Sequence, residues 1–143
     1  KNAKGALVFA LQGELGSGKT TFVQGFLRGL GIKKRSPSPT FIIIRRFRIS
    51  KFGFRALYHV DAYRIKNPRE LLNLGIKEIF SDSKNIVLIE WADKIFADGV
   101  CLSVGQGSSS GGKKAISRGA ILVKFKYGKK ENERAILFNR GKM

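Results

Sequence analysis

The sequence has little cysteine, little proline, few acidic residues and no long apolar run. Its 143 residues contain a single cysteine, Cys101, so no disulfide can form within the chain and the reducing cytosol is the expected compartment. No apolar stretch approaches the roughly 20 residues that span a bilayer. The N-terminal apolar run is no convincing signal peptide, because Gln12 and Glu14 follow it at once. We therefore expect a cytoplasmic protein with no membrane partner.

The scarcity of acidic residues leaves a large positive charge. The chain has 28 Lys and Arg against 10 Asp and Glu, a formal net charge of +18. The segment Lys33–Arg55 holds eight basic residues and no acidic one, and Lys113–Lys142 holds ten against two. Such a charge attracts polyanions: RNA, nucleotides or an acidic protein. A specific nucleic-acid surface and an ordinary solvated surface both stay open, because the interleaved aromatic residues also fit strands that pack one face inward.

Apolar periodicity predicts alternating strands and helices within one domain, residues 1–143. The expected strands are 6–11, 41–49, 56–60, 85–91, 116–127 and 134–138. The expected helices are 19–30, which Gly31 would cap, and one that Pro68 opens and Gly75 interrupts, followed by a short turn at 76–80. SPSPT at 36–40 is an irregular turn, and GQGSSSGG at 105–112 is a flexible loop. This order predicts an α/β fold whose central sheet is mostly parallel, with antiparallel edge strands.

The stretch GELGSGKT, Gly13–Thr20, matches the phosphate-binding loop G-x-x-x-x-G-K-[ST]. Its glycines let successive backbone N–H groups surround an anion, and the following helix adds its positive N-terminal end. Lys19 would reach the outer phosphates, and the Thr20 hydroxyl would coordinate Mg²⁺. The expected nucleotide-binding residues here are Gly13, Glu14, Leu15, Gly16, Ser17, Gly18, Lys19, Thr20 and Thr21. A buried strand before the loop and an amphipathic helix after it predict a P-loop NTPase-like three-layer sandwich.

Two carboxylates are candidates for the metal and for catalysis. Glu90 ends the apolar strand NIVLIE, which is the Walker B pattern, and Asp61 ends the strand LYHVD. Both would open on the sheet edge where a nucleotide binds. Chemistry on Mg·ATP needs one acid to hold the metal and another to orient the attacking water, and the sequence does not assign these roles between the two. His59 would share a strand face with Asp61, and a structural role is the favoured interpretation for it.

The identity of the nucleotide and the reaction leave alternatives. The chain has neither the N-K-x-D nor the D-x-x-G motif of GTPases, so adenine is favoured. A small P-loop kinase remains an alternative. The arginines of RRFR at 45–48 could replace those of a kinase lid, although the surrounding sequence is typical of a strand. A basic RNA-binding module with a vestigial nucleotide site is the other alternative.

Five blocks in order resemble the TsaE (YjeE) family: GELGSGKTTFVQGFLRGLG, SPSPTF, YHVDAYRI, LNLGIKEIF and IVLIEWAD, over roughly residues 6–96. The resemblance implies a P-loop ATPase of bacterial threonylcarbamoyladenosine (t6A) synthesis on tRNA, acting with TsaB and TsaD. The implied cofactors are ATP or ADP and Mg²⁺. Because no arginine finger is evident, we expect turnover that is slow alone and stimulated by the partners.

The same resemblance assigns residues one by one. It implies that Lys19 and Thr20, with Thr21 beside them, hold phosphate and Mg²⁺, that Glu90 is the metal-associated acid, and that Asp61 of H-x-D-x-Y-R acts in hydrolysis. The remaining implied contacts are Thr40 of the S-P-T turn near the γ-phosphate, Trp91 near the nucleotide, and Arg134 near the base.

The chain also departs from the family pattern. Relatives usually begin with a helical segment and a short strand before the loop strand, whereas about a dozen residues precede Gly13 here. We therefore expect a truncated or divergent N-terminus. The loop at 105–112 replaces a proline-containing connection, and the high positive charge leaves tRNA contact through a basic surface as an open interpretation.

Overall fold

The computed structural model describes residues 5–33, 42–67, 69–96 and 120–140. Several sequence-based predictions lie outside these ranges: the turn at 36–40 with Thr40, the helix start at Pro68, the loop at 105–112, and the beginnings of two predicted strands, residue 41 and residues 116–119. Cys101 lies outside them as well.

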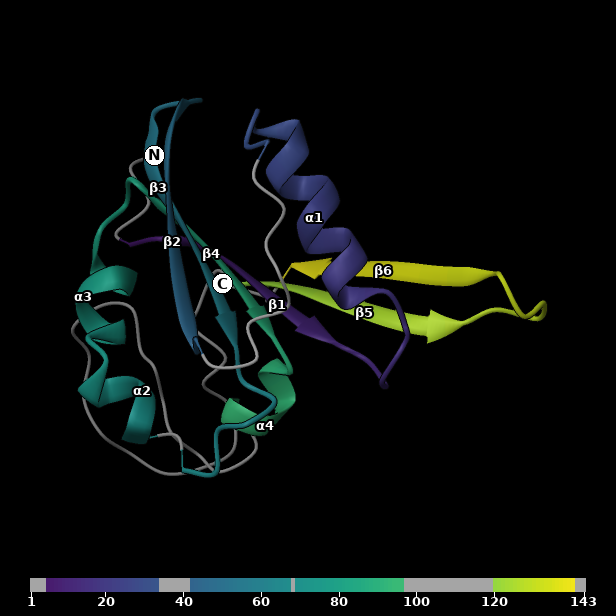
Figure 1. The fold of residues 1–143 in the computed structure, drawn as a ribbon. Coiled ribbons are helices and arrows are strands. Elements are labelled where there is room, and N and C mark those ends of the chain that lie inside the picture. Colours follow the sequence, from purple (N-terminus) through teal and green to yellow (C-terminus); the bar gives the residue numbers. More distant parts are fainter. Residues whose placement is uncertain (1–4, 34–41, 68, 97–119, 141–143) are drawn as a thin grey trace.

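The described residues form a six-stranded mixed sheet in the order β2-β3-β4-β1-β5-β6 (Figure 1). The strands are β1 (Leu7–Gln12), β2 (Ile44–Lys51), β3 (Phe54–Asp61), β4 (Asn85–Glu90), β5 (Ile121–Tyr127) and β6 (Arg134–Arg140). The pairs β3–β4, β4–β1 and β1–β5 are parallel, whereas β2 and β6 add antiparallel edges. This confirms the predicted α/β class and the predicted mixture of strand directions.

Helices contribute to the apolar core on both faces of this sheet. They are α1 (Lys19–Gly29), α2 (Arg69–Asn73), α3 (Ile76–Ser81) and α4 (Ala92–Phe96). Leu88 of β4 belongs to the cluster that contains Val23 and Leu27 of α1, whereas its neighbour Ile89 belongs to the cluster that contains Leu71 of α2. This alternation follows from the two-residue period of a strand. Figure 1 accordingly shows α1 on one side of the sheet and α2 and α3 on the other.

The sequence analysis missed α4, which was not predicted. With five residues, it is too short to show a helical repeat of apolar positions. None of the helices in the described part of the chain has the length and apolar character needed to cross a membrane.

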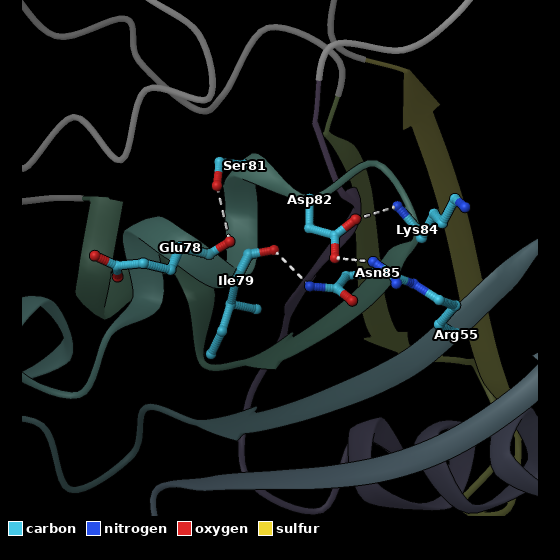
Figure 2. A network of polar contacts seen from close by, with 7 residues as sticks. All are labelled: Arg55, Glu78, Ile79, Ser81, Asp82, Lys84 and Asn85. Atoms are coloured by element: carbon cyan, nitrogen blue, oxygen red, sulfur yellow. Dashed lines mark hydrogen bonds and ion pairs between the residues drawn. The ribbon is translucent and has the colours of Figure 1, made fainter.

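A polar network fixes the turn between α3 and β4, at the end of β4 farthest from Glu90 (Figure 2). The buried Asn85 side chain donates through Nδ2 to the Ile79 carbonyl at 3.0 Å. The Asp82 carboxylate accepts the Lys84 backbone N–H at 2.9 Å and pairs with Arg55 at 3.0 Å. These contacts position the first residue of β4, and therefore the place where the strand delivers Glu90.

Candidate functional site

The glycine-rich loop connects the carboxyl end of β1 to the first residue of α1 and lies tightly against β5. Gly18 precedes the helix with φ of 102°, a conformation that residues with a side chain rarely adopt. A Cβ on Gly13 would lie 2.8 Å from the Phe125 carbonyl oxygen and 2.7 Å from Ser17 Oγ. The Tyr127 hydroxyl donates a hydrogen bond to the Leu15 carbonyl. The loop therefore packs directly against β5.

Lys19 bends back over the loop that precedes it. Its ammonium group donates to the Gly13 and Glu14 carbonyls, each at 2.7 Å, and lies 3.8 Å from the ring centroid of Trp91. The side chain is 5% exposed. Burial lowers the pKa of Lys19, while nearby carboxylates, Glu90 foremost, act in the opposite direction. The buried Lys19 ammonium group thus lies between the loop carbonyls and the ring of Trp91.

Thr20 and Glu90 meet although 70 residues separate them in sequence. The Thr20 hydroxyl donates to Glu90 Oε2 at 2.8 Å. The contact arises because β1 and β4 are parallel neighbours, with Leu11 paired to Glu90, so both strands end at the same edge. The other carboxylate oxygen, Oε1, lies 2.8 Å from His59 Nε2, and both side chains are almost completely buried.

Asp61 lies at the same edge, as the sequence predicted, because it pairs in register with Glu90 across β3 and β4. Its carboxylate is half-buried and accepts the Tyr63 backbone N–H at 3.0 Å. Its negative charge also acts on Lys19. The two predicted acids are therefore neighbours, but they differ in surroundings: Glu90 contacts Thr20 directly, and Asp61 sits toward solvent.

Trp91 closes one side of the site. Its backbone has φ of 59°, an uncommon value for a residue with a large side chain. The ring contacts Lys19 and lies 5.0 Å from the Tyr63 ring, centroid to centroid. The Lys94 ammonium nitrogen, from α4, lies 4.3 Å from the ring centroid of Tyr63 and 5.7 Å from the ring centroid of Trp91. The sequence analysis placed Trp91 near the site. It quoted Tyr63 only as part of the H-x-D-x-Y-R block, without a role, and it did not single out Lys94.

The predicted nucleotide-binding residues differ in exposure. Ser17 and Lys19 are buried, whereas the exposed members are Glu14, Leu15, Gly16, Thr20, Thr21 and Arg134. Arg134 of β6 lies over the Tyr127 ring at 4.5 Å and donates to the Glu131 carbonyl at 2.7 Å. It is therefore linked to the loop through a tyrosine that the sequence analysis did not single out.

The oxygen atoms at this site suit a metal ion that takes most of its ligands from water and phosphate. Among the described residues, no group of three or more His, Cys, Asp or Glu side chains could hold a metal ion. One hydroxyl and one carboxylate, Thr20 and Glu90, lie within 2.8 Å of each other beside the loop. Mg²⁺ commonly binds through one or two carboxylates and completes its shell with water and phosphate oxygens. The residues present fit such an ion.

The fold and this site define an α/β protein in which a glycine-rich strand–loop–helix unit faces the acidic end of a neighbouring parallel strand. The family model described as "Threonylcarbamoyl adenosine biosynthesis protein TsaE" matches residues 1–115, and the chain belongs to this family.

Similar proteins carry the same name. The chain is 44% identical over 93 residues to "tRNA threonylcarbamoyladenosine biosynthesis protein TsaE" of Bacillus subtilis, covering 65% of this chain and 55% of that protein. It is 38% identical over 89 residues to the protein of that name from Haemophilus influenzae, covering 62% and 54%. It is 36% identical over 96 residues to the Rickettsia prowazekii protein of that name, covering 66% of this chain and 63% of that protein. The chain thus spans little more than half the length of most of these relatives.

Proposed function

We propose that this chain binds ATP with Mg²⁺ and hydrolyses it, as the ATPase component of tRNA threonylcarbamoyladenosine synthesis. The names of its relatives support the pathway. The observation that carries the ATPase proposal is the contact of Thr20 with Glu90 at 2.8 Å, directly beside the buried Lys19 ammonium group. We also assign the fold to the three-layer P-loop NTPase class on the strength of this loop and its neighbouring strands.

In this proposal the residues divide the work as follows. The loop N–H groups and Lys19 bind the phosphates, and Lys19 exchanges its carbonyl contacts for phosphate oxygens. Thr20 and Glu90 hold Mg²⁺, which supplies positive charge to the reacting phosphate oxygens. Asp61, half-buried at the same edge, orients the attacking water. Trp91 and Arg134 border the nucleotide.

The assembly partners in this proposal are TsaB and TsaD, and the setting is the bacterial cytoplasm. Turnover is expected to be slow without them, because the sequence contains no evident arginine finger to stabilise the charge that develops during phosphoryl transfer. The net charge of +18 supports an additional contact with tRNA.

Equilibrium dialysis against labelled ADP with excess Mg²⁺ tests the nucleotide site. Lys19→Ala should weaken binding at least tenfold, a loss of about 1.4 kcal/mol or more, because it removes the buried cation. The matched control is Lys77→Ala, which deletes an equal charge from the exposed face of α3. Equal affinities for the two variants would remove the basis for a phosphate-binding role of the loop.

Phosphate release, measured with and without purified TsaB–TsaD, tests the reaction. We expect a slow basal rate that rises when the partners are added. Label transferred to a hydroxylated acceptor rather than to water would favour a kinase instead. Salt-sensitive tRNA binding without any nucleotide binding would favour the RNA-binding alternative.

A further inference from the structure

His59 is the histidine of β3 whose ring is buried beneath Glu90. Its side chain is 2% exposed, and Nε2 lies 2.8 Å from Glu90 Oε1. Within the described part of the chain, Nδ1 is buried and has no hydrogen-bond partner. The chain holds one histidine, so this ring can be observed without ambiguity. Among the residues that the structure describes, the ring therefore has one polar contact, and that contact is with the acid of the candidate metal site.

The two ring nitrogens have different surroundings, which decides where the proton lies. A carboxylate oxygen only accepts hydrogen bonds, so the short contact requires a proton on Nε2. A proton on Nδ1 would be a buried donor without an acceptor, and such donors are costly. The favoured state thus has Nε2–H donating to Glu90 and a bare Nδ1.

This hydrogen bond controls how Glu90 presents its carboxylate. Oε1 is occupied by His59, and Oε2 is left for the Thr20 hydroxyl on the loop side. With both oxygens held, the carboxylate cannot rotate freely about its terminal bond. Carboxylates that bind metals are commonly oriented by such outer hydrogen bonds, whose loss lowers metal affinity about 10- to 100-fold.

We propose that His59 is a positioning residue: its Nε2–H fixes Glu90 so that one oxygen faces Thr20 and the metal. This inference rests on the proposed function, since it assigns Glu90 to Mg²⁺. It differs from a purely structural role for His59, which would affect folding stability but not the metal.

The first test needs no ligand. In the full chain labelled with ¹⁵N-histidine, NMR chemical shifts report which ring nitrogen carries the proton. We expect a protonated Nε2. An unprotonated Nε2 would overturn the proposal, because the ring could then not donate to Glu90.

The second test measures metal affinity directly, with Mn²⁺ replacing Mg²⁺ and free Mn²⁺ followed by EPR in the presence of ADP. His59→Leu should weaken Mn²⁺ binding about tenfold or more. His59→Gln, whose amide reaches the place of Nε2, should restore most of the loss. His59→Asn, whose amide ends near the place of Nδ1, should not, and this pair decides the matter if the leucine variant fails to fold.

Val60→Ala is the matched control. Val60 is buried on the same strand but belongs to the core cluster on the other face, so its truncation lowers the melting temperature without touching Glu90. Its Mn²⁺ affinity should equal that of the unmodified chain. If the unmodified chain binds no Mn·ADP, the proposed function fails, while the NMR result still reports on the His59 contact. If the unmodified chain binds and His59→Leu binds equally well, the positioning role is wrong.

Discussion

Replacing Gly13 by alanine probes how closely the loop is pressed against β5. The new Cβ would lie 2.7 Å from Ser17 Oγ, 2.8 Å from the Phe125 carbonyl oxygen and 2.9 Å from Phe125 Cβ. Ser17 could turn its hydroxyl away. Phe125 cannot move as easily, because its backbone lies between β1 and β6 in the sheet.

The expected cost has two parts. Forcing a methyl group into a filled space costs about 1–3 kcal/mol, and Gly13 has φ of 155°, which is strained for a residue with a side chain. That strain adds about 1–3 kcal/mol. The sum, about 2–6 kcal/mol, is a large part of the roughly 5–15 kcal/mol by which domains are stable. At about 3–4 °C per kcal/mol, we expect the melting temperature to fall by about 6 °C or more.

Gly25→Ala is the control with the opposite sign. Gly25 lies in α1 and is exposed, and a Cβ there would meet no atom of the described residues within 4 Å. Alanine in a helix should stabilise the protein by about 0.5–1 kcal/mol. Urea unfolding followed by Trp91 fluorescence, with thermal melting by circular dichroism, measures both variants. A Gly13→Ala protein as stable as the unmodified chain would show that the loop is not packed on β5 as described.

The polar network of Figure 2 supplies the remaining stability predictions. Asn85→Ala should cost about 1–3 kcal/mol in urea unfolding, because it leaves the Ile79 carbonyl without its buried donor. Arg55→Ala should cost less than Asn85→Ala, since the Arg55–Asp82 pair is exposed. The pKa of Asp82 is lowered, first by the Lys84 backbone N–H and also by Arg55. The carboxylate therefore stabilises the fold above the ordinary aspartate pKa of 3.8, and this stabilisation is lost as the pH falls through the lowered pKa of the folded state. Asp82→Asn should be less stable than the unmodified chain at neutral pH, and the difference should disappear in acid.

Each of these has a contrary outcome. A smaller loss for Asn85→Ala than for Arg55→Ala would mean that the turn is not held by the buried amide. A stability difference between Asp82→Asn and the unmodified chain that stays constant from neutral pH into acid would mean that the Asp82 carboxylate gains nothing from its partners in the fold.

The parts of the fold that the sequence predicted are those with a strong local signal. The apolar run before Gly13 and the spacing of Val23 and Leu27 predicted β1 and α1 almost to the residue, with α1 ending at Gly29 rather than Leu30. Gly75 was predicted to interrupt a helix, and it separates α2 from α3. The strand order is different in kind, because it depends on contacts between distant segments that no local pattern encodes.

The candidate site shows the same division. The sequence predicted the loop and the two acids, because the loop matches the G-x-x-x-x-G-K-[ST] spacing and each acid ends an apolar strand. The contact of Glu90 with His59 was not, since it requires knowing that β3 and β4 are parallel neighbours in a particular register. The sequence analysis favoured a structural histidine there, and its available signals were the shared strand face with Asp61 and the H-x-D-x-Y-R block. The role of Tyr127 likewise depends on β5 lying beneath the loop.

The most direct test of the account is calorimetric titration of the unmodified chain with ADP, once with Mg²⁺ and once with a chelator. The account predicts saturable binding at one site with Mg²⁺ and weaker binding without it, because it assigns Thr20 and Glu90 to the ion that would bridge the protein and the phosphates. No heat of binding at millimolar ADP with Mg²⁺ present would contradict the account.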